Sequence, residues 1–298
     1  MTTQVSYKVT TIATNVDKEI DRLRAQVDLF WDSEVRHYAG SGLRDGMNVV
    51  ELGCGPGFTT GKLLETYPGI TITAVDLDPL LLDVARDRLA ERYDGRISFR
   101  VGSIEDTELP ADTFDFALTR LVLEHLPDPV VAVREVARIL RPGARAAFVD
   151  NDFEMHIMTS PPVDSLGELY EAYCAARVAE GGNPRIGREL PMVLAAGGLS
   201  RVGFEVLSAH SAIIGTEIFL GSEGVGIPTK LVRDGFLSSK ALARISVSWR
   251  DMMADPNHSI LRQLYLASGE KTTTHQENGD TDGSGKPYQA GPGHRPAQ

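Results

Sequence analysis

The residues best suited to holding a small ligand lie in the stretch VVELGCGPGFTTG, residues 49–61. An apolar run there stops at an acid, Glu51, and is followed by Gly53, Gly55 and Gly57. Glycine loses more conformational freedom on folding than any other residue, so this concentration indicates a loop that a ligand approaches closely. The spacing G-x-G-x-G differs from the G-x-G-x-x-G of dinucleotide sites, and Glu51 would repel a pyrophosphate. A ligand with a positively charged end suits Glu51 better.

A second acid, Asp76, follows the next apolar run, ITITAV. An acid at the end of the second strand of an α/β sheet can accept hydrogen bonds from both hydroxyls of a ribose. Together with the glycine loop, Asp76 therefore predicts a ligand that contains a nucleoside without phosphate groups.

One histidine and two aspartates supply candidate acid–base chemistry. His125 lies in TRLVLEHLPDP, and because an imidazole can lose its proton near neutral pH, it is a candidate general base. Asp150 and Asp152 follow a later apolar run and are candidates to orient an acceptor. Structural alternatives stay open, since Asp128 makes the segment after His125 a good entry into a helix and polar residues are common where a strand reaches solvent.

The elements that position these residues alternate along the chain. Five apolar runs and the helical patterns between them predict βαβ units, and two later runs complete a sheet. The expected fold is α/β, a doubly wound and mostly parallel sheet of seven strands. The predicted strands are residues 48–52, 70–76, 97–101, 114–119, 144–149, 203–214 and 260–268. The predicted helices are residues 58–67, 79–93, 129–140, 163–180, 187–196 and 229–254.

The domain prediction is a single unit over residues 1–272 that carries two helical additions. An amphipathic helix over about residues 15–38 precedes the glycine loop, and a helical insertion over about residues 217–255 covers the strand ends. The last segment, residues 273–298, is polar and glycine-rich, so we expect a disordered tail.

Composition narrows the possible partners. The formal charge of -11 and a pI near 5.1 disfavour attraction to nucleic acid or to anionic membranes. We find no run of about 18 apolar residues and no signal-peptide pattern, and therefore expect a cytoplasmic protein. Cys54 and Cys174 are too few for a disulfide framework and do not form a metal-binding spacing, so we expect no metal.

Taken in order, the motifs VVELGCGPG, AVDLDP, FDFALTRLVLEHLPDP and ILRPGARAAFVDND resemble those of class I S-adenosylmethionine-dependent methyltransferases, in particular those that act on small molecules. The resemblance covers about residues 15–270 and implies the Rossmann-like fold of that family. It implies that Glu51 and the three loop glycines surround the methionine part of S-adenosylmethionine, that Asp76 holds the ribose, and that Leu77 lies against the adenine.

The remaining cofactor contacts depart from the family pattern at one position. Relatives often carry an aspartate after the third strand, whereas the aligned residue here is Ser103, whose hydroxyl makes a weaker acceptor. Ile104 can offer its backbone amide to the adenine ring. Arg120 is predicted to pair with the cofactor carboxylate and Leu121 to pack on its adenosyl part, although a salt-bridged Arg120 at a helix start is the alternative.

The function implied is methyl transfer to a small organic acceptor at oxygen, nitrogen or carbon. Holding the acceptor atom and the methyl group about 3 to 3.5 Å apart can supply much of the acceleration, so a base is optional. The main alternative is a partner or regulatory subunit that binds the cofactor without catalysis. The insertion also permits a homodimer. Residues singled out as core or pocket candidates are Gln26, Trp31, Tyr38, Arg185, Arg188, Phe219, Phe236 and Trp249.

Overall fold

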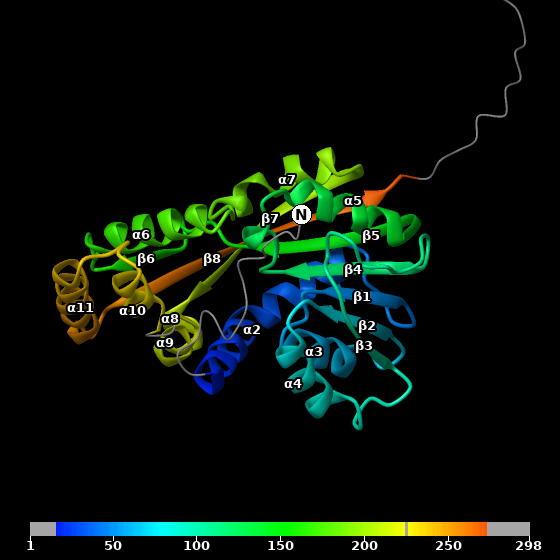
Figure 1. Cartoon of the computed structure of the whole chain (residues 1–298). Coiled ribbons are helices and arrows are strands. Elements are labelled where there is room, and N and C mark those ends of the chain that lie inside the picture. Colours follow the sequence, from blue (N-terminus) through cyan, green and yellow to red (C-terminus); the bar gives the residue numbers. More distant parts are fainter. Residues whose placement is uncertain (1–15, 224–225, 273–298) are drawn as a thin grey trace, which may run out of the picture.

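The computed structural model describes residues 16–223 and 226–272, which surround one mixed β-sheet (Figure 1). The expected tail at 273–298 lies outside the described residues. Five parallel strands form the first part of the sheet in the order β3-β2-β1-β4-β5, as a doubly wound fold requires. Their bounds are β1 Asn48–Leu52, β2 Thr71–Asp76, β3 Ile97–Val101, β4 Phe114–Arg120 and β5 Leu140–Asp150.

Helices cover both faces of these strands, and each face has its own apolar core. Alternate side chains of one strand point to opposite faces, so Val49 and Val50 belong to different clusters. Helices α2 and α3 contribute to one cluster, and α5 and α7 to the other (Figure 1). The bounds are α2 Val16–Gly40, α3 Phe58–Thr66, α4 Pro79–Leu89, α5 Pro129–Ile139 and α7 Ile186–Ala196.

Two of these helices begin as the sequence predicts. The side chain of Asp78 accepts a hydrogen bond from the Leu80 amide, and that of Asp128 accepts one from the Val130 amide. A proline occupies the first turn of each helix, where its missing N–H costs nothing. These caps fix where the chain turns from β2 and from the loop after β4 into α4 and α5.

The last part of the sheet has one strand more than predicted. β8, Ser259–Lys271, runs antiparallel to β5 through Tyr265–Glu270 and pairs with β7, Leu199–His210, on its other edge. Because β8 extends past β5, its first residues leave an edge that β6, Ile157–Ser160, covers. β6 has no apolar run, with only alternate side chains half-buried, and this explains why the sequence pattern missed it.

The insertion is a set of short helices and not one helix over 229–254. Ser211 begins a short helix, so β7 also ends earlier than predicted. Gly235, at φ +82°, separates α10 from α11, and Ser238 caps α11 by accepting from the Ala241 amide. The bounds are α6 Leu166–Ala179, α8 Ser211–Ile214, α9 Thr216–Glu223, α10 Gly226–Arg233 and α11 Ser239–Ala254. α10 and α11 pack on α6, and α9 packs on α2 (Figure 1).

Candidate functional site

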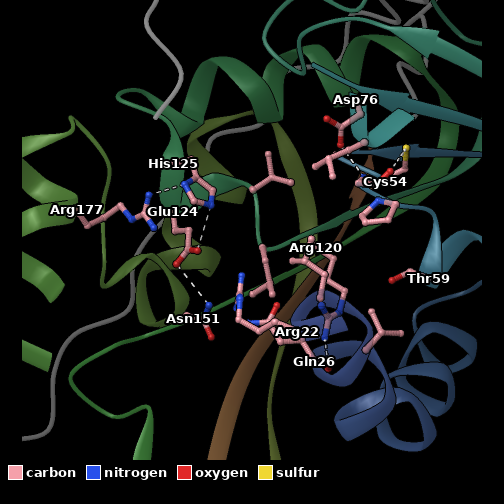
Figure 2. A pocket seen from close by; sticks show the side chains of 18 of the residues that line it. Arg22, Gln26, Cys54, Thr59, Asp76, Arg120, Glu124, His125, Asn151 and Arg177 are labelled. Carbon is pink, nitrogen blue, oxygen red and sulfur yellow. Dashed lines mark hydrogen bonds and ion pairs between the residues drawn. The ribbon is translucent and has the colours of Figure 1, made fainter. Parts of the chain in front are cut away.

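A cavity opens at the carboxyl ends of β1, β2 and β4, where the strand order reverses (Figure 2). This is the place where open α/β sheets bind ligands. One end of the cavity is formed by the glycine loop and Asp76, and α2, α6, α9, α10 and β8 form the remaining wall. The cavity therefore has a loop side that local motifs build and a cap side that distant segments build.

The glycines of the loop have positive φ angles that other residues rarely adopt. Gly53 lies at φ +79°, and a Cβ on it would lie 2.2 Å from Cγ2 of Val122. Gly55, at φ +53°, has no atom within 4 Å of the place a Cβ would take, so space is open there. Gly53 and Gly55 line the cavity. Gly57, predicted with them, does not line it and packs instead against α4, where a Cβ would lie 2.8 Å from Leu89.

The two acids of the loop side are both turned into the cavity wall. Oε2 of Glu51 accepts a hydrogen bond from the Thr60 hydroxyl at 2.5 Å, and burial raises the pKa of Glu51 to about 8. Asp76 accepts from the amides of Gly55 at 2.7 Å and Asp78 at 2.8 Å, while burial raises its pKa. Each Asp76 oxygen keeps a second lone pair with which to accept a hydroxyl.

Four further predicted cofactor residues line the same side: Leu77, Ser103, Ile104 and Leu121. The Ser103 hydroxyl accepts from the amide of Glu105 at 3.1 Å, which shapes the turn after β3. Leu121 has φ +56°, a strained value for a leucine, directly after β4. Strain of this kind is often stored where a ligand site needs one particular backbone course.

Arg120 lines the cavity and is buried in an ion pair with the first helix. Its Nε lies 2.9 and 3.0 Å from the two carboxylate oxygens of Glu34, and Nη2 donates to the Gln26 carbonyl at 2.9 Å (Figure 2). The Tyr38 hydroxyl donates to the same carboxylate at 2.6 Å. Nη1 of Arg120 makes no hydrogen bond to residues 16–223 or 226–272, so the guanidinium keeps a donor for a ligand. The salt-bridged alternative for Arg120 and a ligand contact are thus compatible.

His125 lies in a short 3-10 turn, Leu123–His125, and is linked to a chain of polar side chains. Nδ1 of His125 lies 2.6 Å from Nη1 of Arg177. Nε2 of His125 lies 3.3 Å from Oε1 of Glu124. The Asn151 amide donates to Glu124 at 3.4 Å, which extends the chain across the cavity wall (Figure 2). Both ring nitrogens of His125 are therefore engaged within the protein.

The two aspartates predicted to orient an acceptor do not line the cavity. Asp150 is fully buried and accepts from the amides of Asn151 and Glu124 at 3.0 and 3.3 Å. Burial raises its pKa well above the usual value. Asp152 is ion-paired with Arg188, whose Nη2 lies 2.7 Å away. Asn151, between the two aspartates, is the residue that faces the cavity.

Family comparison agrees with this geometry. Residues 50–148 match the family described as "Methyltransferase domain". Residues 50–148 thus form a methyltransferase domain. A likeness of fold extends the result to 82% of this chain, which superposes with a TM-score of 0.55 on 53% of Haemonchus contortus phosphoethanolamine N-methyltransferase 2 in complex with S-adenosyl-L-methionine, at 18% identity. At that identity the likeness concerns the fold alone.

Two curated methyltransferases are similar over part of their length. The malonyl-[acyl-carrier protein] O-methyltransferase of Paenibacillus sp. (strain JDR-2) is 31% identical over 131 residues, which are 42% of this chain and 45% of the relative. The ubiquinone biosynthesis O-methyltransferase of Xanthomonas axonopodis pv. citri (strain 306) is 32% identical over 141 residues, which are 43% of this chain and 58% of the relative. The chain thus spans about half the length of the curated relatives it matches.

The cap side of the cavity was not predicted, because its residues carry no motif. Most are charged or aromatic and come from α2, α6, α9, α10, β8 and the segment after β5. The unpredicted lining residues include Arg22, Glu124, Asn151, Phe153, His156, Tyr173, Arg177, Glu180, Ser222, Glu223, Lys230 and Arg262. The cap side of the wall therefore carries many charged side chains.

Of the residues singled out in the sequence as core or pocket candidates, most do not line the cavity. Gln26 lines the cavity, whereas Trp31 and Tyr38 pack into the core. The same is true of the cap aromatics Phe219 and Trp249. Among the lining residues we find neither Phe236, Arg185 nor Arg188.

Neither a metal-binding cluster nor a membrane-spanning helix is found in the described residues. Residues 16–223 and 226–272 contain no group of three histidine, cysteine, aspartate or glutamate side chains arranged to hold a metal ion. Over the same residues, no helix has the length and apolar character needed to cross a bilayer. Cys54 lines the cavity as a buried free thiol, and burial raises its pKa well above the usual value, so the reactive thiolate is disfavoured.

Proposed function

We propose that this chain binds S-adenosylmethionine on the loop side of the cavity and methylates a small organic acceptor bound on the cap side. The observation that carries the proposal is that one continuous cavity joins Asp76 and the open space at Gly55 to the polar wall formed by β8 and the cap helices. Bound there, the cofactor supplies an electrophilic methyl group. The protein positions the acceptor against the methyl group and excludes water from the two.

Each predicted cofactor residue has a place in this proposal. Gly53 and Gly55 let the backbone approach the methionine part, and Glu51 faces its positive end. Asp76 accepts the ribose hydroxyls with its remaining lone pairs. The adenine lies among Leu77, Ser103, Ile104 and Leu121, and Nη1 of Arg120 reaches the cofactor carboxylate. Gly57 acts behind the loop by letting α3 pack closely on α4.

The acceptor is proposed to be a polar small molecule, because charged side chains from five elements line the cap side. The curated relatives named as O-methyltransferases favour oxygen as the methylated atom. Positioning within the cavity is proposed as the main source of acceleration. His125 can serve as a general base only if Arg177 releases Nδ1, and Asp150 and Asp152 act by holding the turn that presents Asn151.

Calorimetric titration with S-adenosylmethionine, and separately with NAD, tests the cofactor. We expect saturable binding of S-adenosylmethionine alone, weakened at least tenfold in Asp76→Asn and unchanged in Asp45→Asn. Asp45 is a matched control, since it accepts a backbone hydrogen bond from Gly69 but does not line the cavity. Binding of NAD alone would refute the proposal. Release of S-adenosylhomocysteine with hydroxylated and amino acceptors then separates an enzyme from a cofactor-binding partner subunit.

A further inference from the structure

The protonation state of His125 can be read from its neighbours. Nη1 of Arg177 lies 2.6 Å from Nδ1, and Glu124 Oε1 lies 3.3 Å from Nε2. All three side chains are buried and line the cavity, with 6%, 4% and 7% of Arg177, Glu124 and His125 exposed. A guanidinium carries only donors and keeps its charge in proteins, so Nδ1 must be the acceptor in this contact.

The protonation of Nε2 of His125 follows from that of Nδ1. A neutral imidazole has one N–H, and since Nδ1 accepts, the proton sits on Nε2, where the Glu124 carboxylate accepts it. We propose that Arg177 is a positioning residue that locks His125 in this neutral form, so that His125 has no free lone pair with which to take a proton from a ligand in the cavity. The inference deepens the proposed function and rests on it, because the acceptor is taken to occupy the same cavity.

The position of Arg177 is itself fixed by helix α6. Its Nη2 donates to the Tyr173 hydroxyl at 2.7 Å, one turn earlier, and Nη1 lies 3.4 Å from Oε2 of Glu180. The two contacts tie the guanidinium to Tyr173 and Glu180. They hold Nη1 beside His125, so this contact joins α6 to the turn that follows β4 (Figure 2).

The net effect of burial and of the neighbouring charges also favours the neutral ring. The charged groups that act on His125 are Arg177 from α6, Glu180 directly after α6, and Glu124 from its own turn. Burial and the charge of Arg177 lower the pKa of His125, and the two glutamates oppose this without reversing it. Burial opposes the ionisation of Glu124, but the hydrogen bond from His125 and the charge of Arg177 help to lower its pKa below the usual value. Near neutral pH the ring is neutral beside an ionised carboxylate.

This arrangement restricts the acceptor. With Nδ1 occupied and Nε2 protonated, His125 cannot remove a proton from a hydroxyl during methyl transfer. The acceptor atom must therefore be nucleophilic without losing a proton to His125, as a neutral amine or an already ionised hydroxyl is. Glu124, which accepts the N–H of His125, then orients the acceptor through its carboxylate.

Nitrogen-15 NMR of the full chain with labelled histidines, with and without S-adenosylhomocysteine, tests the inference directly, because the two ring nitrogens report tautomer and charge. His125→Gln identifies the signal. We expect a neutral ring with the proton on Nε2 at neutral pH. Arg177→Met removes the donor and the charge and is expected to raise the titration midpoint by about 1 to 3 pH units. Arg177→Lys, which keeps the charge, should restore most of the low midpoint.

The signal of His37, on α2 and outside the cavity lining, serves as the matched control and should not respond to Arg177→Met. A charged ring at neutral pH, a proton on Nδ1, or an unchanged midpoint in Arg177→Met would overturn the inference. If Arg177→Met does not fold, the tautomer of the wild-type chain still decides. Failure of the wild-type chain to bind S-adenosylmethionine would instead refute the proposed function, whatever the tautomer.

Discussion

The buried ion pair between Arg120 and Glu34 offers the most informative perturbation. It joins β4 to α2 through contacts of 2.9 to 3.0 Å, with 7% and 0% of the two side chains exposed. Removing one partner of a buried pair leaves an uncompensated charge and costs about 3 to 5 kcal/mol. We therefore expect Arg120→Met to lower the free energy of unfolding by about that amount.

The double variant Arg120→Met, Glu34→Met carries no stranded charge. Its remaining cost comes from the Tyr38 hydroxyl, which loses the acceptor it holds at 2.6 Å, and from the Gln26 carbonyl, which loses the Arg120 donor at 2.9 Å. An unsatisfied buried hydroxyl costs about 1 to 3 kcal/mol, so the double variant should be more stable than Arg120→Met alone. The two substitutions are thus expected to be strongly non-additive, as residues in direct contact are.

Urea unfolding followed by tryptophan fluorescence measures the three variants and the wild-type chain. Arg244→Met is the matched control, because Arg244 pairs with Glu168 at 2.5 Å while both side chains are about half exposed, at 48% and 47%. An exposed pair contributes about 0 to 1 kcal/mol. The reasoning would be refuted if Arg120→Met cost no more than this control, or if the double variant cost the sum of its two single variants.

Three further predictions concern the glycine loop, Glu51 and Asp152. Gly57→Ala should lower the free energy of unfolding by more than Gly55→Ala, because both have positive φ but only Gly57 lacks space for a Cβ, and urea unfolding compares them. The pKa of Glu51, about 8, exceeds the unfolded value of 4.5, so the folded chain binds the extra proton and stability should fall as pH rises from 4.5 to 8, by at most about 1.4 kcal/mol per pH unit. Glu51→Gln should flatten that slope, and an equal slope in both chains would contradict the assignment. Asp152→Asn should lower the free energy of unfolding while leaving S-adenosylmethionine affinity within about twofold. A large loss of affinity in calorimetry would show that Asp152 contributes to the binding site.

The sequence by itself determined the parallel half of the fold. Alternating apolar and helical periods predict β1 to β5 within a few residues, because each period depends on neighbours close in the chain. The caps Asp78 and Asp128 and the positive φ angles of the loop glycines are equally local. The prediction of a doubly wound sheet is confirmed, and the comparison of residues 50–148 confirms the methyltransferase family.

Only the tertiary structure decided which side chains meet in the cavity. Arg120 and Glu34 stand 86 positions apart, and Arg177 and His125 stand 52 apart, so no local period links them. The sequence named Asp150 and Asp152 as a pair, whereas the residue between them faces the cavity. Neighbouring residues of an extended segment point to opposite sides, and only the packing of the sheet settles which side is the site.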